Sequence, residues 1–345
     1  MSESTQVSGI DTERVTAWFE ANVGSVVPPL RFDLIAGGHS NLTYRVTDDA
    51  GSRWVLRRPP TGQVLATAHD MEREFRIISA LAPTDVPVPP VSGLCTDAAV
   101  NGAPFYVMEF VDGLVVRAQG VGEQLSVDQR RRAGEDLVDT LAKIHAVDVD
   151  AVGIGDLGRR EAYLARQLKR WYGQWQQSKT RELPAVDEVH DYLVANAPEQ
   201  REATIVHGDY RLDNCLISPD GEVAAVLDWE ICTLGDPLAD VGLLMVYWAD
   251  PGDAASAMLS PATALEGFPD RDQLAARYAE RTGRDLSELS LYTAFGYWKL
   301  ACILEGVYAR YVGGSMGTTD PGGFEMFKDQ VDHYAAIAHR LAGLS

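Results

Sequence analysis

The sequence has little of several features that mark particular classes of protein. Only four cysteines (Cys95, Cys215, Cys232 and Cys302) occur among 345 residues, and none has C-x-x-C spacing. This argues against a disulfide framework or a cysteine-based zinc site and favours a reducing compartment. Basic residues are also scarce, since 30 Lys and Arg face 50 Asp and Glu, giving a net charge of −20. Because nucleic acids and anionic membranes attract basic surfaces, we expect neither as a partner.

Long apolar runs and targeting signals are missing as well. No run approaches the roughly 18 apolar residues of a membrane span, and the polar start MSESTQVSG lacks a charged-then-apolar signal. We therefore expect a cytoplasmic protein. Hydrophobic residues still make up 46% of the chain, which is enough for a sizeable core. A length of 345 residues favours two lobes with separate cores.

The most informative motif is HGDYRLDN at residues 207–214, which is followed by Asp228. In kinases, an Asp orients and deprotonates the attacking hydroxyl, and an Asn five residues later holds a metal ion. A later Asp, placed after a short hairpin, bridges the metal ions to the phosphates. Asp209, Asn214 and Asp228 have this spacing. We therefore predict Asp209 as the catalytic base and Asn214 and Asp228 as Mg²⁺ ligands.

The residues between the two predicted metal ligands indicate a hairpin. Strand-like runs at 216–217 and 223–227 flank the sequence SPDG, with Pro second and Gly fourth in the turn. Such a hairpin would bring Asn214 and Asp228 within roughly 7 Å, counted at strand rise. One Mg²⁺ ion could then contact both side-chain oxygens, which are the kind of ligand that Mg²⁺ prefers.

Other polar residues near the motif have simpler interpretations. We expect His207 to shape the loop by packing and hydrogen bonding and not to carry a proton. Arg211 and Asp213 could form a local ion pair, although Arg211 stays open as a phosphate or substrate contact. Asp240, in GDPLAD at 235–240, is expected to brace the catalytic loop as a structural acid.

Two longer segments carry a family resemblance. HGDYRLDNCLI (207–217) and VAAVLDWEICTLGDPLADVG (223–242) resemble the aminoglycoside phosphotransferase family, the small-molecule branch of the protein-kinase-like fold. YLARQLKRWYGQW (163–175) and YTAFGYWKLACILEGVYARY (292–311) are similar to the phosphotransferase domains that occur alone in bacteria or fused to acyl-CoA dehydrogenases. The resemblance extends from about residue 30 to the C-terminus.

This resemblance implies a two-lobed α+β kinase-like fold. An N-lobe at 30–113 would hold an antiparallel sheet with the nucleotide-binding residues and the hinge. A mainly helical C-lobe at 114–345 would hold the catalytic loop, the metal site and the acceptor pocket. Residues 1–29 would form a partly disordered N-terminal segment. ATP would bind between the lobes.

Phosphate-binding and adenine-binding residues are expected on the first strands. Strand candidates at 31–36 and 42–47 are joined by a Gly-Gly turn carrying Ser40, and the free amides of such a turn suit a phosphate. On the next strand, Arg57 stands where kinases have the lysine of V-A-I-K. A guanidinium can bind phosphate oxygens bidentately, although an exposed strand-end charge is the alternative interpretation. Val55 would share the face of Arg57 and line the adenine slot.

Helical periodicity predicts a helix at 70–81, and this helix is expected to carry the glutamate that pairs with Arg57. Glu74 matches the helix glutamate that pairs with the strand cation, and Glu72 is its competitor. Further helices are predicted by a capping box at Ser126, by periodicity and by a glycine stop; they cover 126–145, 160–178 and 290–312.

A buried strand beginning at Phe105 should run into the hinge between the lobes. The backbone groups of Glu109 and Val111 would there bind the edge of the adenine. Because backbone atoms make these hydrogen bonds, the assignment depends on position and not on side-chain type.

These residues predict transfer of the γ-phosphoryl group from ATP, or alternatively GTP, to a hydroxyl of a small molecule with Mg²⁺. The closer resemblance favours a hydroxylated acyl compound, such as a hydroxyacyl-CoA. An aminoglycoside or amino-alcohol acceptor remains open. A nucleotide-binding pseudokinase also remains open, because Arg57 replaces the lysine that is usual in kinases. A metal-dependent hydrolase would need further ligands beside His207, Asp209 and Asp228, and none accompany them in the sequence. The oligomeric state is not predicted.

Five cations on two predicted helices could give the acceptor pocket a basic lining. Each taken singly is more typical of a solvated helix charge. They are Arg166, Lys169, Arg170, Lys299 and Arg310.

Overall fold

The computed structural model describes residues 7–37, 41–61, 70–253, 260–314 and 322–344. The chain divides into two units. The first unit comprises Met1–Gly113, Val152–Ile154 and Ala224–Glu230, and the remaining residues form the second unit. Besides the predicted 30–113, the first unit thus includes the residues before 30 and two short segments after 113, of which 224–230 carries the predicted metal ligand Asp228.

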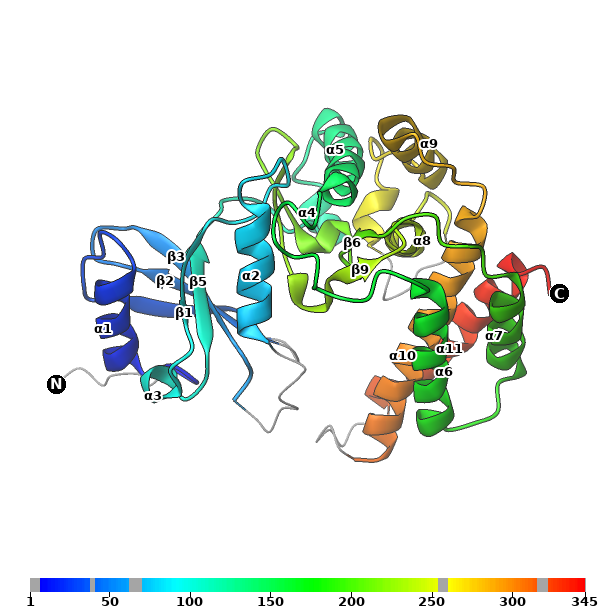
Figure 1. Ribbon diagram of the computed structural model, residues 1–345, viewed down its shortest axis with the longest axis horizontal. Coiled ribbons are helices and arrows are strands. Elements are labelled where there is room, and N and C mark those ends of the chain that lie inside the picture. Colours follow the sequence, from blue (N-terminus) through cyan, green and yellow to red (C-terminus); the bar gives the residue numbers. More distant parts are fainter. Residues whose placement is uncertain (1–6, 38–40, 62–69, 254–259, 315–321, 345) are drawn as a thin grey trace. The chain divides into compact units, whose positions relative to one another are not determined.

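The first unit is built on a five-stranded antiparallel sheet (Figure 1). Its strands are β1 (Arg31–Gly37), β2 (Leu42–Thr47), β3 (Arg53–Arg58), β4 (Val91–Cys95) and β5 (Phe105–Glu109), in the order β1-β2-β3-β5-β4. From Tyr44 on, buried and partly exposed residues alternate along β2, as predicted from period-two patterning. At the start of the strand the pattern differs, because Leu42 is partly exposed and Thr43 is buried. β1, β2 and β5 confirm the strands predicted from sequence.

The N-terminal residues contribute more structure than we expected. α1 (Thr12–Asn22) starts at Asp11, whose side chain accepts a hydrogen bond from the Arg14 N–H. Val15 and Phe19 of α1 are fully buried, and the Phe19 ring lies 6.0 Å from Trp54 on β3 in an edge-on arrangement. α1 therefore completes the core of the sheet. The predicted disorder falls mainly on residues 1–6, which lie outside the described residues.

The helix predicted at 70–81 is α2 (Met71–Leu81). It begins at Asp70, which accepts a hydrogen bond from the Arg73 N–H. Its buried face contains Met71, Glu74, Ile77, Ile78 and Leu81. A carboxylate on this otherwise apolar face requires a buried partner. The short helix α3 (Ala98–Asn101) lies between β4 and β5.

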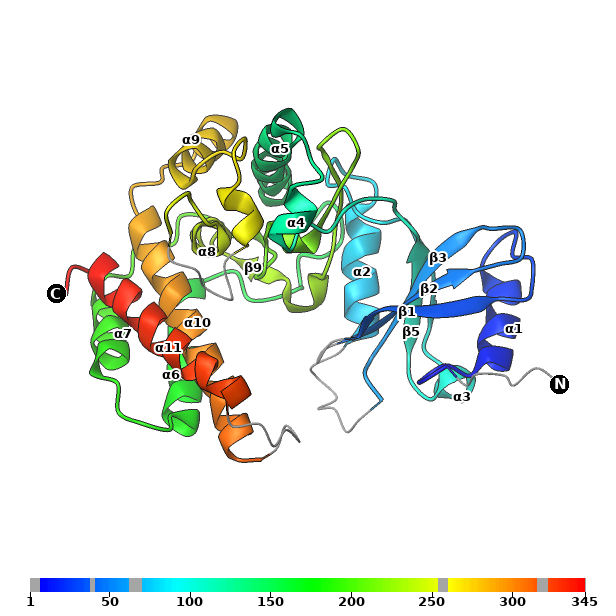
Figure 2. The same cartoon turned by 180° about the vertical axis from the view of Figure 1, so that it is seen from behind.

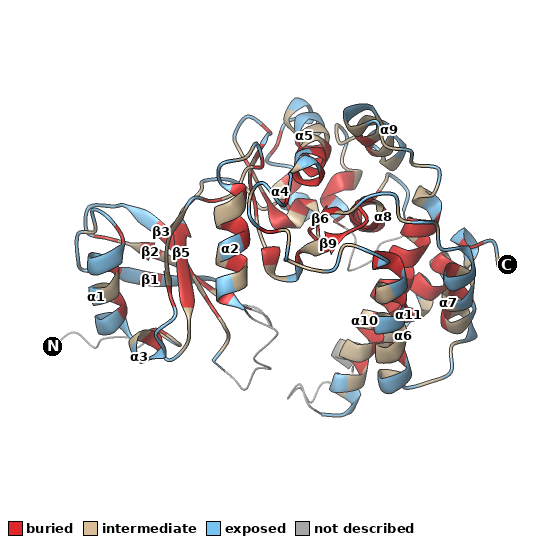
Figure 3. Ribbon diagram, in the orientation of Figure 1, coloured by how far each residue is buried: buried red, intermediate tan, exposed pale blue. Residues whose placement is uncertain are grey.

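The second unit is mainly helical. Its helices are α4 (Gln119–Gly122), α5 (Val127–Ala146), α6 (Tyr163–Ser178), α7 (Pro184–Asn196), α8 (Leu238–Tyr247), α9 (Arg271–Thr282), α10 (Leu289–Val312) and α11 (Gly322–Leu341). α10 packs against α6, α8 and α11, and Figure 2 shows α11 lying along α10. Buried residues concentrate on α8 and α10 (Figure 3). Within the described ranges, every helix is too short or too polar to cross a lipid bilayer.

Helix ends in this unit follow the local sequence. The capping box at Ser126 is formed with Gln129, as predicted. α10 ends at the predicted glycine, Gly313, whose N–H donates to Ala309 O. The unit also contains the antiparallel pair β6 (Thr204–Val206) and β9 (Thr233–Gly235).

The turn predicted between the metal ligands is present. β7 (Cys215–Ile217) precedes it and β8 (Val223–Val226) follows it. The Ser218 N–H donates to Glu222 O, and Gly221 takes a positive φ of 82°. A Cβ at that glycine would lie 2.7 Å from the backbone of Gln129, so glycine is needed there for space as well as for conformation.

Candidate active site

The predicted catalytic loop, residues 207–214 and called the catalytic loop below, turns sharply after β6. Gly208 takes a φ of 85°, which residues with a Cβ disfavour. A Cβ at this position would lie only 3.1 Å from the Ile231 side chain. The glycine therefore permits the turn that presents Asp209.

Asp240 braces this loop from α8, as predicted. Its carboxylate is fully buried and accepts hydrogen bonds from the His207 N–H at 2.7 Å and the Gly208 N–H at 2.8 Å. His207 is also buried, and its Nδ1 accepts a hydrogen bond from the Asp209 N–H at 3.3 Å. These bonds fix three successive peptides of the loop, which restricts where the Asp209 side chain can point.

A buried histidine supports Asp240 from the other side. His145 Nε2 lies 3.3 Å from Asp240 Oδ2, and His145 Nδ1 lies 2.6 Å from the hydroxyl of Tyr278. Burial lowers the pKa of His145. Burial alone would raise the pKa of Asp240, but the bonds from His145 and Gly208 outweigh this and hold that pKa below its usual range. From sequence, position 145 was only the end of the helix predicted at 126–145, and the contact with α8 gives His145 this role.

We expect Asp240→Asn to destabilise the second unit by about 3 kcal/mol, because an amide offers one acceptor where two buried N–H groups need acceptors. Urea unfolding of parent and variant measures the loss. The folded pKa of Asp240 is depressed, so this stabilisation is present above the unfolded-state pKa of about 4 and is lost as the pH falls through the folded pKa.

The matched change Asp329→Asn, at an exposed position on α11, should alter stability by less than about 0.5 kcal/mol. Equal losses in the two variants would contradict a bracing role.

Asp209 lies among groups that orient it without burying it. A quarter of its side chain (25%) is exposed. Asn214 Nδ2 donates at 2.8 Å to both Asp209 Oδ2 and the Asp209 backbone oxygen. This leaves the side-chain oxygen of Asn214, which is the atom a metal ion would use, for other ligands. Burial and the nearby Asp209 carboxylate raise the pKa of Tyr247, whose hydroxyl bonds to Asp209.

Arg211 has neighbours besides the predicted Asp213. The Nε atom of Arg211 lies 3.7 Å from Asp209 Oδ2, and its guanidinium lies 4.8 Å above the Tyr247 ring. Asp213 lies 3.8 Å from Arg117, and the charges of Arg211 and Arg117 both counter the rise that burial causes in the pKa of Asp213. Residues far apart in sequence supply both Tyr247 and Arg117, so local spacing gave no sign of these contacts.

In the first unit, Arg57 is the centre of an acidic cluster. Its Nε lies 3.3 Å from Glu74, and its Nη2 lies 2.7 Å from Asp228 Oδ1 and 4.0 Å from Glu230. Glu74 is 1% exposed, whereas Glu72 is exposed. Of the two glutamates weighed from sequence, Glu74 is therefore the one that pairs with Arg57, and Arg57 is not an exposed strand-end charge.

Tyr106 on β5 completes this cluster and was not predicted from sequence. Its hydroxyl bonds to Glu74, and burial together with the Glu74 carboxylate raises the pKa of Tyr106. Burial also raises the pKa of Glu74, and Arg57 partly offsets that rise. A neutral phenol that donates to Glu74 and a cation beside it both favour the ionised carboxylate. The sequence did contain one sign of this role, because Tyr106 places a phenol hydroxyl in a strand that is otherwise mostly apolar.

The backbone at Asp228 is unusual. Its φ of 65° lies in the left-handed region, where residues other than glycine are uncommon. Such conformations persist where the surroundings hold them and are frequent at functional sites. Here the ion pair with Arg57 holds the side chain. Arg57 thus occupies one of the carboxylate oxygens that a metal ion would use.

The remaining predicted nucleotide contacts lie along the sheet. Val55 is buried on β3 opposite Met108. The Glu109 N–H donates to Pro90 O, so Glu109 can offer adenine only its carbonyl. The Val111 N–H follows the end of β5 and has no acceptor among the described residues. Ser40 lies outside the described residues.

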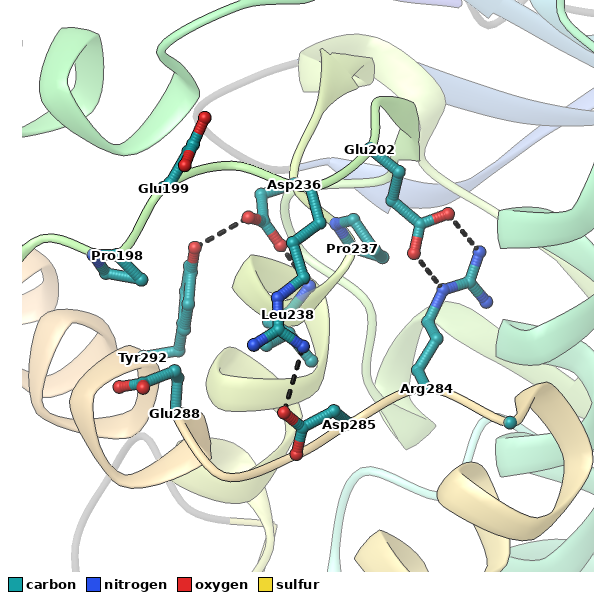
Figure 4. A pocket seen from close by; sticks show the side chains of 12 residues that line it. Pro198, Glu199, Glu202, Asp236, Pro237, Leu238, Arg284, Asp285, Glu288 and Tyr292 are labelled. Carbon is teal, nitrogen blue, oxygen red and sulfur yellow. Dashed lines mark hydrogen bonds and ion pairs between the residues drawn. The ribbon is translucent and has the colours of Figure 1, made fainter.

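A separate cavity of about 250 Å³ occurs in the second unit (Figure 4). Its lining comes from segments 198–202, 236–238 and 283–292, and the described part of the catalytic loop contributes nothing to it. Most of its polar side chains are satisfied within the cavity wall: Glu202 binds Arg284 at 2.6 Å, and Asp236 accepts from the Tyr292 hydroxyl at 2.7 Å. Asp236 also accepts a hydrogen bond from the Leu238 N–H at 2.9 Å, so it holds the start of α8 four residues before Asp240.

An antiparallel-sheet unit and a helical unit with a braced H-G-D loop define a protein of the kinase-like class. Residues 31–292 match the model of the phosphotransferase enzyme family. The chain belongs to this family, and it is a phosphotransferase-class enzyme with the fold predicted from its sequence.

Three known proteins illustrate the likeness. Mouse acyl-CoA dehydrogenase family member 10 is 36% identical over 297 residues, which cover 83% of this chain but 27% of that protein. The chain therefore spans about a quarter of that relative's length. A Ralstonia eutropha protein classed as an aminoglycoside phosphotransferase has a TM-score of 0.83 at 34% identity, with 96% of this chain and 98% of that one covered. An aminoglycoside phosphotransferase solved with AMP-PNP and hygromycin B, with a TM-score of 0.61 at 15% identity and coverage of 97% and 98%, shares the fold.

Proposed function

We propose that this protein transfers the γ-phosphoryl group of ATP, with Mg²⁺, to a hydroxyl of a hydroxylated acyl compound such as a hydroxyacyl-CoA. The observation that carries the proposal is the partly exposed Asp209, held by Asn214 on a loop that Asp240 braces. Asp209 would take the proton of the acceptor hydroxyl as its oxygen bonds to the γ-phosphorus and ADP leaves. Because the transition state is loose, positioning and charge neutralisation supply most of the catalysis.

The nucleotide would be held by residues of the first unit. The Arg57 side chain is 13% exposed, is charged and is already oriented by Glu74, so it can serve in place of the usual lysine by binding phosphate oxygens. Val55, the Glu109 carbonyl and the Val111 N–H would receive the adenine, and Ser40 would contact phosphate. Asn214 and Asp228 supply an amide oxygen and a carboxylate, which are hard ligands suited to Mg²⁺. The bound Mg²⁺ would neutralise the phosphates.

The acceptor class is supported by the curated relatives. Several are acyl-CoA dehydrogenase family members whose chains contain a segment like this one. A phosphotransferase segment joined to an acyl-CoA dehydrogenase would act on the same class of compound. The net charge of −20 would instead attract polycationic aminoglycosides, but net charge does not determine the charge of a local pocket.

Two alternatives have specific support. An aminoglycoside or amino-alcohol acceptor is favoured by fold neighbours that bind such compounds. A pseudokinase is suggested by Arg57, whose Nη2 contacts Asp228 Oδ1 at 2.7 Å and would have to release it for a metal ion. The retained Asp209, Asn214 and Asp228 favour turnover.

Competitive turnover distinguishes these possibilities. The protein is incubated with ATP, Mg²⁺ and a mixture of hydroxyacyl-CoA isomers, kanamycin and an amino alcohol, and phosphorylated products are identified by mass spectrometry. We expect ADP release coupled to a phosphorylated acyl compound. Robust phosphorylation of kanamycin with no acyl product would establish the aminoglycoside alternative, and nucleotide binding without any product would establish the pseudokinase.

A further inference from the structure

Lys299 is a buried cation beside the catalytic loop. It lies in the middle of α10, and only 8% of the residue is exposed. Its Nζ donates to the carbonyl oxygen of Gly208 at 3.4 Å, and it lies 5.8 Å from the centre of the Trp171 ring on α6. Gly208 immediately precedes Asp209, so this ammonium lies close to the predicted catalytic base.

The contacts of Lys299 leave most of its hydrogen-bonding capacity unused. An ammonium has three donors, and the described residues provide one carbonyl at long range and no carboxylate within ion-pairing distance. Burial lowers the pKa of Lys299, while the more distant Asp209 and Asp240 carboxylates favour the charged form. A buried charge without strong partners costs free energy of folding. A purely structural role therefore does not explain a lysine at this position.

None of the other four cations considered from sequence is buried as a whole residue or bonds to the catalytic loop in the described part of the chain. Lys169, Arg170 and Arg310 are exposed. Arg166 is partly buried, and its Nη2 donates to Arg159 O at 2.6 Å. The structure therefore separates Lys299 from a general basic lining, because it is the one of these five cations whose described contacts include the catalytic loop.

We propose that the Lys299 ammonium binds an oxygen of the acceptor, a carbonyl or carboxylate near the reacting hydroxyl, with the Trp171 ring packed beside it. The assignment rests on the proposed function, because it assumes that a hydroxyl is presented to Asp209. Such an acceptor oxygen would satisfy the unused donors of Lys299. The positive charge of Lys299, with Arg170 near it, disfavours an acceptor that carries a cationic group beside Lys299.

The position of Lys299 favours an acceptor that carries an oxygen near its reacting hydroxyl. An acceptor whose hydroxyl contacts Asp209 brings its neighbouring atoms close to the carbonyl of Gly208, which Lys299 contacts. A thioester or carboxylate oxygen there would accept from an ammonium in a mostly water-free setting, where charge-assisted hydrogen bonds are strong. An amino sugar would place ammonium groups at the same point, and like charges would repel.

The test compares two acceptors that differ by one oxygen. Hydroxybutyryl-CoA isomers are paired with hydroxybutyl-CoA thioethers, which keep the hydroxyl and lack the carbonyl. Steady-state kinetics are measured for the parent, for Lys299→Met and for Lys169→Met, which removes an exposed charge from the neighbouring helix α6. We expect Lys299→Met to lower kcat/KM for the thioester about 10- to 100-fold, mainly through KM, as for loss of a charge-assisted hydrogen bond. The thioether should be affected less than about threefold, and Lys169→Met should change neither acceptor.

Each result decides the matter. Equal losses for thioester and thioether would overturn the proposal, because a lysine that only supports the loop through Gly208 would slow both acceptors. Calorimetry of the same acceptors with the same variants, in the presence of Mg²⁺ and ADP, gives a second readout that does not require turnover. If the parent transfers no phosphoryl group but Lys299→Met still weakens thioester binding selectively, the proposed function fails and the role of Lys299 stands. If the parent does not bind the thioester more tightly than the thioether, the role of Lys299 fails.

Discussion

Replacing Asp209 by Asn is expected to slow phosphoryl transfer by about 10²-fold or more while nucleotide affinity stays within about twofold of the parent. This is the usual scale for loss of a general base. Asn preserves the shape of the side chain and still offers an oxygen to Asn214 Nδ2, which now donates to Asp209 at 2.8 Å. The fold and the loop should therefore persist. Single-turnover transfer and calorimetric ATP binding measure the two effects separately.

The matched control for this variant is Asp220→Asn. Asp220 is exposed in the turn after β7, and its backbone N–H bonds to Ser218, so its loss of charge should leave transfer unchanged. If Asp209→Asn and the parent turned over an identified acceptor at the same rate, Asp209 would not be the base.

The second large effect is expected from Asp228→Ala, which should abolish the Mg²⁺-dependent part of ATP binding. Asp228 is the proposed carboxylate ligand, and without it the ions that bridge the phosphates lose an anchor. Calorimetric titration with ATP in the presence and absence of Mg²⁺ measures the difference. The parent should bind more tightly with Mg²⁺, and the variant should show no such gain.

The variant should remain folded, because Arg57 keeps its contact with the buried Glu74. Alanine at a φ of 65° adds a backbone cost of about 1 kcal/mol. Asp228→Asn removes the charge and tolerates that conformation better, so it separates the backbone effect from the metal effect. Asp49→Ala, at an exposed position after β2, is the matched control. A variant at position 228 that kept the full Mg²⁺ gain would remove Asp228 from the metal site.

Elements with strong local signals were predictable from sequence. Period-two alternation predicted β2, and helical periodicity predicted α2. The capping box at Ser126 predicted the start of α5, and the glycine at 313 predicted the end of α10. Each signal comes from residues within a few positions of one another, so no long-range contact is needed to read it. α1 was missed because its core contacts are made by only two fully buried side chains, Val15 and Phe19.

The spacing of Asp209, Asn214 and Asp228 was readable from fixed offsets along the chain, and the resemblance of longer segments to a known family indicated the kinase-like fold and the phosphotransferase family. Which charges are buried, and with which partners, became clear from the folded chain alone. The fold pairs Glu74 and not Glu72 with Arg57, adds Tyr106 to that pair, and supports Asp240 with His145. It also distinguishes the buried Lys299 from three exposed cations and the partly buried Arg166. The physical reason is that burial and pairing depend on elements distant in sequence, and a charged residue on a helix looks the same in sequence whether it faces water or the interior.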